Sequence, residues 1–124
     1  MLDTSKIHIF YACDDNFVKF TMVSFESMKQ NASRDKKYHV HVLHTNITPE
    51  TQSRMLKMAD DCFEITFDNV SAYLNDLCER LPLRDYYSNT TYYRMFIADM
   101  YPELDKAIYI DSDTVVTGDI FGAL

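Results

Sequence analysis

Apolar and polar residues along the chain follow two alternating periodicities, which predict a regular succession of strands and helices. Short β-rich apolar runs are separated by stretches in which apolar residues recur every three or four positions, as from Val18 to Met28. Strands that alternate with helices indicate βαβ units, and hence an α/β fold with a mostly parallel sheet and right-handed crossovers. The predicted strands are residues 7–12, 39–44, 62–67 and 107–110.

Polar residues mark where the predicted helices begin and end. A polar turn at 31–37 ends the first helix, and Thr48 with Pro49 predicts the start of the second, because a capping hydroxyl precedes proline at the first helical position. Met55, Leu56 and Ala59 are expected to continue the second helix. A short helix is expected over 70–77, followed by a loop around Pro82. The last predicted helix is capped by Asn89 or Thr90, ends before Pro102, and buries Tyr93, Ile97 and Met100.

The fourth predicted strand runs directly into an Asp-x-Asp pair. Residues 107–110 have the continuous apolar character of a strand buried on both faces, and Asp111 and Asp113 follow its C-terminal end. Ligands of open α/β sheets bind in the crevice outside such ends. Two carboxylates one residue apart repel each other unless a cation lies between them or one is protonated. The pair therefore holds a hard divalent metal or divides into a nucleophile and an acid, with a plain turn and Asp cap as the structural alternative.

The residues that follow the first strand are expected at the same edge of the sheet. Asp14, Asp15 and Asn16 carry acceptors and amides that could read a nucleotide base and its ribose, or could simply cap the first helix. Arg94 precedes the fourth strand. It would hold a phosphate or a sugar hydroxyl if it faces the crevice, and would be an ordinary surface charge otherwise.

Two histidines on the second strand form a weaker candidate. His39 and His41 project from the same strand face and could both bind zinc. Because no third ligand stands at a suitable spacing, we interpret them as partly buried strand residues.

Composition narrows the classes of function. A length of 124 residues suggests one domain, and the net charge of −7 disfavours a nucleic-acid partner, which needs a basic face. No run approaches the roughly 18–20 apolar residues of a membrane span, and the first strand begins too early for a signal peptide. The three widely spaced cysteines favour reduced thiols in a cytosolic chain. Both glycines follow the Asp pair, so there is no Gly-rich phosphate loop and a metal is the expected group to neutralise a bound diphosphate.

Three ordered segments gain specificity when they are taken together. They are Ile-Phe-Tyr-Ala-Cys-Asp-Asp-Asn-Phe at 9–17, Thr-Thr-Tyr-Tyr-Arg at 90–94 and Ile-Tyr-Ile-Asp-Ser-Asp-Thr-Val-Val at 108–116. In order and spacing they resemble glycosyltransferase family 8. The resemblance implies a Rossmann-like GT-A nucleotide-sugar-binding fold and transfer of a hexose from UDP-glucose or UDP-galactose to a saccharide or glycan acceptor, with retention of configuration. We expect a cytoplasmic location, with the full-length enzyme either free or peripheral at the inner membrane face.

The resemblance also implies a role for each site residue. Asp111 and Asp113 would bind Mn²⁺, or Mg²⁺, bridging the diphosphate, with Asp111 also near the ribose. Arg94 would reach the donor sugar and, with the metal, stabilise the charge on the departing UDP. Arg94, Asp111 and Asp113 are thus the catalytic set. The nucleotide-sugar site would comprise Ala12, Cys13, Asp14, Asp15, Asn16, Arg94, Asp111, Ser112 and Asp113, with Ala12, Asp14 and Asn16 at the uracil and ribose.

The chain departs from the family pattern after the Asp pair. Family members supply a third metal ligand, a histidine, together with a glycine and a lysine, from a C-terminal half that also holds the acceptor site. The chain ends at Leu124 as a new element begins. We therefore expect residues 1–124 to be the N-terminal nucleotide-binding half of a GT-A domain, which binds Mn²⁺ and UDP weakly and does not turn over alone.

Two other functions remain open at this point. A haloacid-dehalogenase-like phosphatase would use Asp111 as nucleophile and Asp113 as acid and base. Its motif begins a domain, however, whereas about a hundred residues precede the pair here. A non-catalytic Rossmann-like interaction module would use the pair only as a cap.

Overall fold

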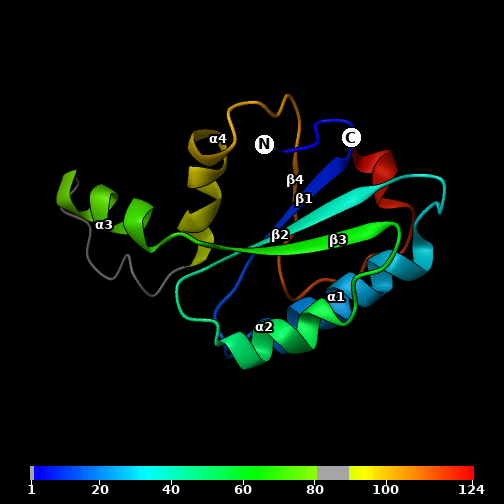
Figure 1. Cartoon of the computed structure of the whole chain (residues 1–124), viewed down its shortest axis with the longest axis horizontal. Helices are drawn as coiled ribbons and strands as arrows, with labels where there is room; N and C mark the ends of the chain where they lie inside the picture. Colours follow the sequence, from blue (N-terminus) through cyan, green and yellow to red (C-terminus); the bar gives the residue numbers. More distant parts are fainter. Residues whose placement is uncertain (1, 81–89) are drawn as a thin grey trace.

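The computed structural model describes residues 2–80 and 90–124, which are built around a four-stranded parallel sheet (Figure 1). Neighbouring strands follow the order β3-β2-β1-β4, and every pairing is parallel. This confirms the predicted α/β class and the parallel sheet. The strands are β1 (Ile7–Ala12), β2 (Tyr38–His44), β3 (Phe63–Asn69) and β4 (Ile108–Tyr109).

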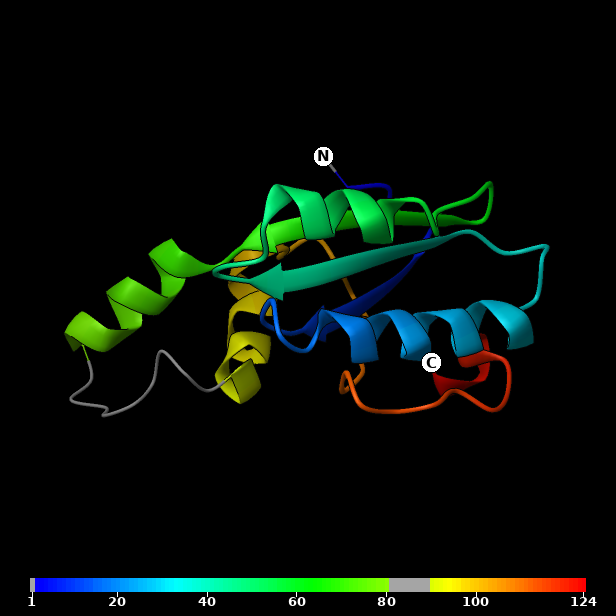
Figure 2. The same cartoon turned by 90° about the horizontal axis from the view of Figure 1, so that it is seen from below.

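Helices cover both faces of the sheet (Figures 1 and 2). Alternate residues of each strand point to opposite faces, so each face contributes to its own apolar cluster. None of the described helices is both long enough and apolar enough to cross a membrane. On one face lie α1 (Val18–Asn31) and α2 (Pro49–Leu56). The other described helices are α3 (Ser71–Arg80), the 3-10 helix η2 (Thr90–Phe96), α4 (Ile97–Met100) and the 3-10 helix η3 (Ile120–Ala123).

The two apolar clusters fasten the helices to the sheet. Under α1 and α2, Ile9 and Val40 from the strands pack with Phe25, Met28 and Met55, all with no exposed surface. On the opposite face the second cluster joins β1 and β2 to the segments that contain α3, η2 and α4. Its buried members are Phe10, Ala12, Leu43, Val70, Leu74, Tyr93 and Phe96.

The first two helices differ in how they begin, and the predicted cap is found at the second. Thr48 caps α2, because its hydroxyl accepts a hydrogen bond of 3.2 Å from the backbone N–H of Thr51. The first helix instead has Phe17 at its N-cap, with no side-chain cap bond. Asp14 acts one turn earlier, since its carboxylate accepts bonds of 3.0 Å from the N–H groups of Asn16 and Phe17.

Two predicted helices differ in extent from the structure. Helix α2 ends at Leu56, so the expected continuation to Ala59 is wrong. The helix predicted after residue 89 is instead η2 followed by a single turn of α4. The reason lies in the burial of Tyr93 and Phe96, because residues three apart share one side of a 3-10 helix. Residues 81–89, which include the expected Pro82 loop and Asn89 cap, lie outside the described residues.

The fourth strand is shorter and less covered than its sequence indicates. Strand β4 has only two residues, and in the described structure it pairs with β1 alone and lies at the edge of the sheet. Ala107 is exposed, and Ile108 and Ile110 are half-buried. The prediction of a strand buried on both faces is therefore wrong for this chain. An apolar run indicates that its side chains prefer apolar surroundings, but it does not show whether other elements cover one face of the strand or both.

Candidate functional site

The Asp pair and the end of β1 meet at the C-terminal edge of the sheet. The N–H of Ile110 donates to the carbonyl of Phe10 at 2.9 Å, which carries the pairing of β4 with β1 up to the start of the Asp-x-Asp segment. One step further, the hydroxyl of Ser112 donates to the carbonyl of Ala12 at 3.0 Å. Both segments border a cavity of about 280 Å³, lined by Ala12, Cys13, Phe17, Tyr109, Asp111, Ser112 and Asp113.

The two aspartates present their carboxylates without a cationic partner. Asp111 and Asp113 are exposed, and no ion pair in the described part of the chain includes either of them. Exposed carboxylate oxygens one residue apart are the donors that a hard divalent cation prefers. Because the cavity they line also offers room for further oxygen ligands, the residues present fit Mn²⁺ or Mg²⁺.

Helix α1 holds the Asp-x-Asp segment in place through a chain of hydroxyls. The phenol of Tyr11 lies 2.8 Å from the hydroxyl of Ser24, which lies 3.2 Å from the hydroxyl of Thr114. Thr114 in turn donates to the carbonyl of Asp111 at 2.8 Å. Burial raises the pKa of Tyr11 to about 12, so its phenol keeps its proton at neutral pH.

A second contact between α1 and this segment lies one turn further along the helix. The N–H of Val116 donates to the hydroxyl of Ser27 at 2.8 Å, and the side chain of Asn31 donates to the carbonyl of Val116 at 2.8 Å. The sequence analysis missed these positioning residues. The signal available was the presence of hydroxyls, including buried Ser24, among the apolar positions of the first helix.

Asp14, Asp15 and Asn16 reach the same edge but do not line the cavity. Asp14 is engaged in the turn before α1, as described above. Asp15 bridges to the loop after β2, since its carboxylate accepts from the N–H of Thr48 and its own N–H donates to Asn46, both at 3.3 Å. Asn16 is exposed. The structure thus gives Asp14 and Asp15 structural tasks, and places all three residues beside the cavity rather than in its wall.

Cys13 lies in the cavity wall as a buried, neutral thiol. Its side chain is only 1% exposed, and burial is the main cause that raises its pKa to about 11. Its N–H donates to the carbonyl of Leu43 at 3.1 Å, which continues the pairing of β1 with β2. A thiol that keeps its proton at neutral pH is a poor nucleophile, so Cys13 shapes the cavity.

Arg94 lies on the crevice side of η2. Its guanidinium carbon is 5.8 Å from the centroid of the Tyr109 ring, and Tyr109 lines the cavity. Burial, followed by the charge of Asp111, raises the pKa of Tyr109, while Arg94 opposes this shift. The structure therefore brings a cation to the rim of the cavity next to the aspartates. Phe17 and Tyr109 stand within the motif segments 9–17 and 108–116, but neither was predicted to be a site residue.

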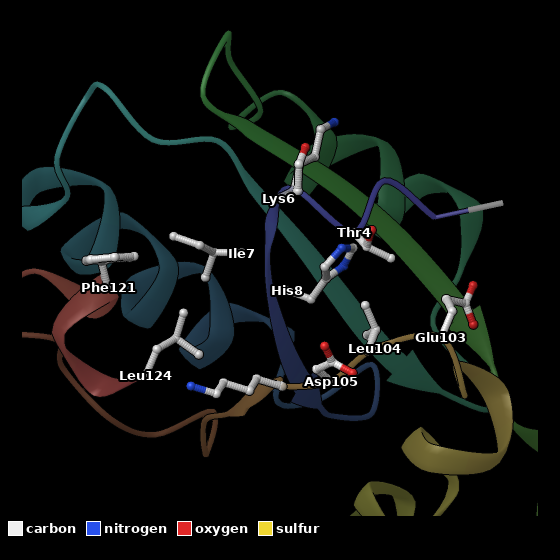
Figure 3. A pocket seen from close by; sticks show the side chains of 11 residues that line it. Thr4, Lys6, Ile7, His8, Glu103, Leu104, Asp105, Phe121 and Leu124 are labelled. Carbon is white, nitrogen blue, oxygen red and sulfur yellow. The ribbon is translucent and has the colours of Figure 1, made fainter.

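A larger cavity, of about 450 Å³, lies at the opposite edge of the sheet (Figure 3). It is lined by residues that precede or begin β1 and by residues that precede β4, including Lys6, His8, Glu103 and Asp105. Ligands of parallel α/β sheets bind at the carboxyl ends of the strands, and this cavity lies at the amino ends. Position and chemistry therefore favour the smaller cavity as the main site.

The histidines of β2 depart from their predicted role. His41 has no exposed surface and His39 is 6% exposed, so both are fully buried rather than partly so. A third histidine is also present, because His8 on β1 pairs in register with His39. The absence of a third ligand was inferred from spacing along the chain, which does not show neighbours on an adjacent parallel strand.

Comparisons with known proteins agree with this fold. The family model described as Glycosyl transferase family 8 matches residues 8–124. Among solved structures, the bifunctional glycosyltransferase WbbM in its apo form superposes with a TM-score of 0.82 at 25% identity, covering 99% of this chain and 21% of that chain. The galactosyltransferase LgtC in complex with donor and acceptor sugar analogs gives a TM-score of 0.70 at 21% identity, covering 94% of this chain and 41% of that chain.

A more distant relative shares the fold as well. Mouse xyloside xylosyltransferase 1, in its apo form, gives a TM-score of 0.68 at 15% identity, covering 95% of this chain and 47% of that chain. A search of curated proteins finds no match. The chain thus has the GT-A fold of these glycosyltransferases and spans less than half the length of each. Because the family model covers nearly all of its residues, the chain belongs to glycosyl transferase family 8.

Proposed function

We propose that this chain is the nucleotide-binding portion of a glycosyltransferase that transfers glucose or galactose from a UDP-sugar to a saccharide or glycan acceptor, with retention of configuration. The observation that carries the proposal is the contact between the Asp-x-Asp segment and the end of β1, where Ser112 bonds to Ala12 above a cavity lined by both aspartates. The resemblance of the three motifs to family 8 supports UDP as the nucleotide and a hexose as the sugar.

Asp111 and Asp113 are proposed to hold Mn²⁺, or Mg²⁺, at this cavity. When bound, the ion would neutralise the diphosphate and act as a Lewis acid on the departing UDP. The protein's own contribution is to hold the two carboxylates in place. The hydroxyl of Ser112, between the two aspartates, does this through the carbonyl of Ala12, and the hydroxyl of Thr114, directly after them, does it through the carbonyl of Asp111.

The remaining site residues are proposed to orient the nucleotide-sugar. Arg94, which lies over Tyr109 at the cavity rim, is proposed to contact the donor sugar and to stabilise negative charge on the leaving group. Ala12 and Cys13 form the floor on the β1 side, and Asp14, Asp15 and Asn16 continue it towards the base and ribose. The exposed side-chain amide of Asn16 carries both a donor and an acceptor and is suited to reading a base edge.

The proposed location is the cytoplasm. Cys13 and Cys62 are free and buried in the structure, as expected for thiols in a reducing compartment.

The test uses the chain as it stands. Thermal unfolding is followed with Mn²⁺ alone, UDP alone and both together, and calorimetric titration measures the UDP affinity. We expect Mn²⁺ to raise the melting temperature and UDP to raise it further only when Mn²⁺ is present, because ligands that bind the native state stabilise it. The absence of any shift with millimolar Mn²⁺ and UDP in a folded sample would contradict the proposal.

Two variants make the test specific. Asp113→Asn should abolish the joint effect of Mn²⁺ and UDP. Asp61→Asn is the matched control, because Asp61 is exposed, loses the same charge on substitution and immediately precedes Cys62 at the opposite, amino-terminal end of the strands. A response to Mg²⁺ with inorganic phosphate in place of UDP would instead favour the phosphatase alternative, and no response to any metal would favour a non-catalytic module.

A further inference from the structure

Three histidines gather on the face of the sheet opposite α1 and α2, away from the Asp pair. His8 comes from β1, and His39 and His41 come from β2. Their exposed fractions are 2%, 6% and 0%. The rings of His39 and His41 stack with centroids 3.8 Å apart, and one ring nitrogen from each histidine lies within 4.8 Å of the others.

The outer nitrogens of two of these rings act as hydrogen-bond donors. The Nε2 of His8 lies 2.8 Å from the carbonyl oxygen of Asp3, which can only accept, so this nitrogen carries a hydrogen. The Nδ1 of His41 lies 3.4 Å from a carboxylate oxygen of Asp68. The hydroxyl of Tyr101 donates to the same carboxylate oxygen at 2.6 Å.

When both outer nitrogens carry the hydrogen, the inner nitrogens of the same two rings face each other as acceptors. The Nδ1 of His8 and the Nε2 of His41 are 2.9 Å apart. When the outer nitrogen of a neutral imidazole carries the hydrogen, the inner one presents a lone pair. Two lone pairs at this distance repel unless a proton or a metal ion lies between them.

We propose that His8, His39 and His41 form a second metal site, for a borderline transition-metal ion such as Zn²⁺, with His8 Nδ1 and His41 Nε2 as two of its ligands. Imidazole nitrogens suit Zn²⁺, whereas the oxygen donors of the Asp pair suit Mn²⁺ or Mg²⁺. The outer nitrogens meet a backbone carbonyl and a carboxylate, which are the partners that orient and polarise metal-binding histidines.

The geometry requires only a small adjustment. Zn–N bonds of about 2.0–2.1 Å at tetrahedral angles place two ligand nitrogens about 3.3 Å apart, so the facing pair must open by about 0.4 Å. His39 is the third ligand, and its Nε2 now lies 2.9 Å from the hydroxyl of Thr66. The hydroxyl of Thr66 has an alternative partner in the Nδ1 of His41, 3.4 Å away, so it can release the Nε2 of His39 to a metal ion.

The site has a route to solvent. His8 also lines the larger cavity at the amino ends of the strands, together with the carboxylates of Glu103 and Asp105 (Figure 3). A cation can therefore reach the cluster without separation of the strands, and water from the cavity can complete the coordination. Bound metal would link β1 to β2 and, through His8, fix the segment that contains Asp3.

The test is a metal titration of the untagged chain after treatment with a chelator. We expect one Zn²⁺ per chain to bind tightly and raise the melting temperature, and Co²⁺ at the same site to give the intense visible absorption of a tetrahedral ion. His39→Gln and His8→Gln should each weaken Zn²⁺ binding at least about tenfold, and Asp68→Asn should weaken it about 10–100-fold through His41. His44→Asn is the matched control, since His44 is a buried histidine of the same strand outside the cluster.

Separate readouts distinguish this site from the Asp pair. Asp113→Asn should remove the Mn²⁺ response and leave the Zn²⁺ affinity unchanged. Zn²⁺ binding that is lost in Asp113→Asn, or retained in both His39→Gln and His8→Gln, would overturn the proposal. Absence of Zn²⁺ binding by the parent chain would also overturn it and would leave a shared proton as the cation between His8 and His41. If a variant fails to fold, the Co²⁺ spectrum of the parent chain still tests whether the site binds a tetrahedral metal ion.

Discussion

The hydroxyl of Ser112 donates a hydrogen bond of 3.0 Å to the carbonyl of Ala12, across a hundred positions of sequence. This bond lies between the two aspartates, so it determines how far their carboxylates stand from the end of β1. A metal bound by the pair and a nucleotide held by the turn after β1 must be in register with each other. We propose that the Ser112–Ala12 contact sets this register.

Replacement of Ser112 by alanine is expected to weaken the joint binding of Mn²⁺ and UDP several-fold. The substitution removes one partly buried hydrogen bond, which contributes about 1 kcal/mol, so the melting temperature should change little. Calorimetric titration of UDP at saturating Mn²⁺ measures the effect. Ser112→Thr keeps the hydroxyl and should bind more tightly than Ser112→Ala; equal affinities for the parent chain and Ser112→Ala would show that the contact does not set the site.

The hydroxyl chain from α1 allows a second, graded prediction. Thr114→Val keeps the shape of the side chain but removes the bonds to the Asp111 carbonyl and to Ser24, and should cost about 1–3 kcal/mol of unfolding free energy. Tyr11→Phe breaks the chain at its far end and should cost about 1 kcal/mol. Urea denaturation measures both values.

The two variants should separate in metal binding. We expect Thr114→Val to lower the Mn²⁺ affinity because Asp111 loses its support, and Tyr11→Phe to leave it nearly unchanged. The same Mn²⁺ affinity in both variants would show that Thr114 does not position Asp111.

The main features of the site were predictable because they follow from general rules of parallel sheets. One apolar strand runs into Asp111 and another ends before Asp14, so their carboxyl ends lie at the same edge of the sheet if the two strands are parallel. In the structure β1 and β4 are parallel neighbours. Thr48 before Pro49 specified the start of α2 through a local hydrogen bond that needs no tertiary context. Both predictions depended on residues close together in sequence or on strand direction alone.

What could not be predicted depends on contacts between distant residues. Spacing along the chain cannot show that His8 lies opposite His39, because the register of two parallel strands depends on packing. The same limit applies to Ser24 and Thr114, which meet across ninety positions. The 3-10 geometry of η2 follows from the burial of Tyr93 and Phe96 against the sheet, which overrides the helical spacing of the sequence.

Arg94 should discriminate between UDP and a UDP-sugar. Its guanidinium lies over Tyr109 at the cavity rim and is proposed to contact the donor sugar, so Arg94→Ala should weaken UDP-glucose or UDP-galactose binding about tenfold and UDP binding much less. Arg94→Lys keeps the charge without the planar group and should recover part of this loss. Parallel titrations with UDP and each UDP-sugar measure the difference, and an equal loss for both would place the guanidinium at the phosphates.

A buried histidine outside both proposed metal sites should make stability depend on pH. His44 is 4% exposed, and its Nδ1 accepts a hydrogen bond of 3.2 Å from the N–H of Ile47, which requires a neutral ring. Burial lowers the pKa of His44, with Asp68 opposing the shift.

Because the unfolded histidine titrates near a pKa of about 6.5, the unfolded state binds more protons than the folded state below that pH, and the contribution of His44 to stability is lost as the pH falls. His44→Asn keeps an acceptor for the N–H of Ile47 but cannot titrate. The free energy of unfolding should therefore fall less between about pH 7 and about pH 5 in the variant than in the parent chain, as measured by urea denaturation with a chelator present. Every other titrating group is common to both proteins and cancels in this difference, so equal falls would mean that the ring of His44 takes up its proton as readily when folded as when unfolded.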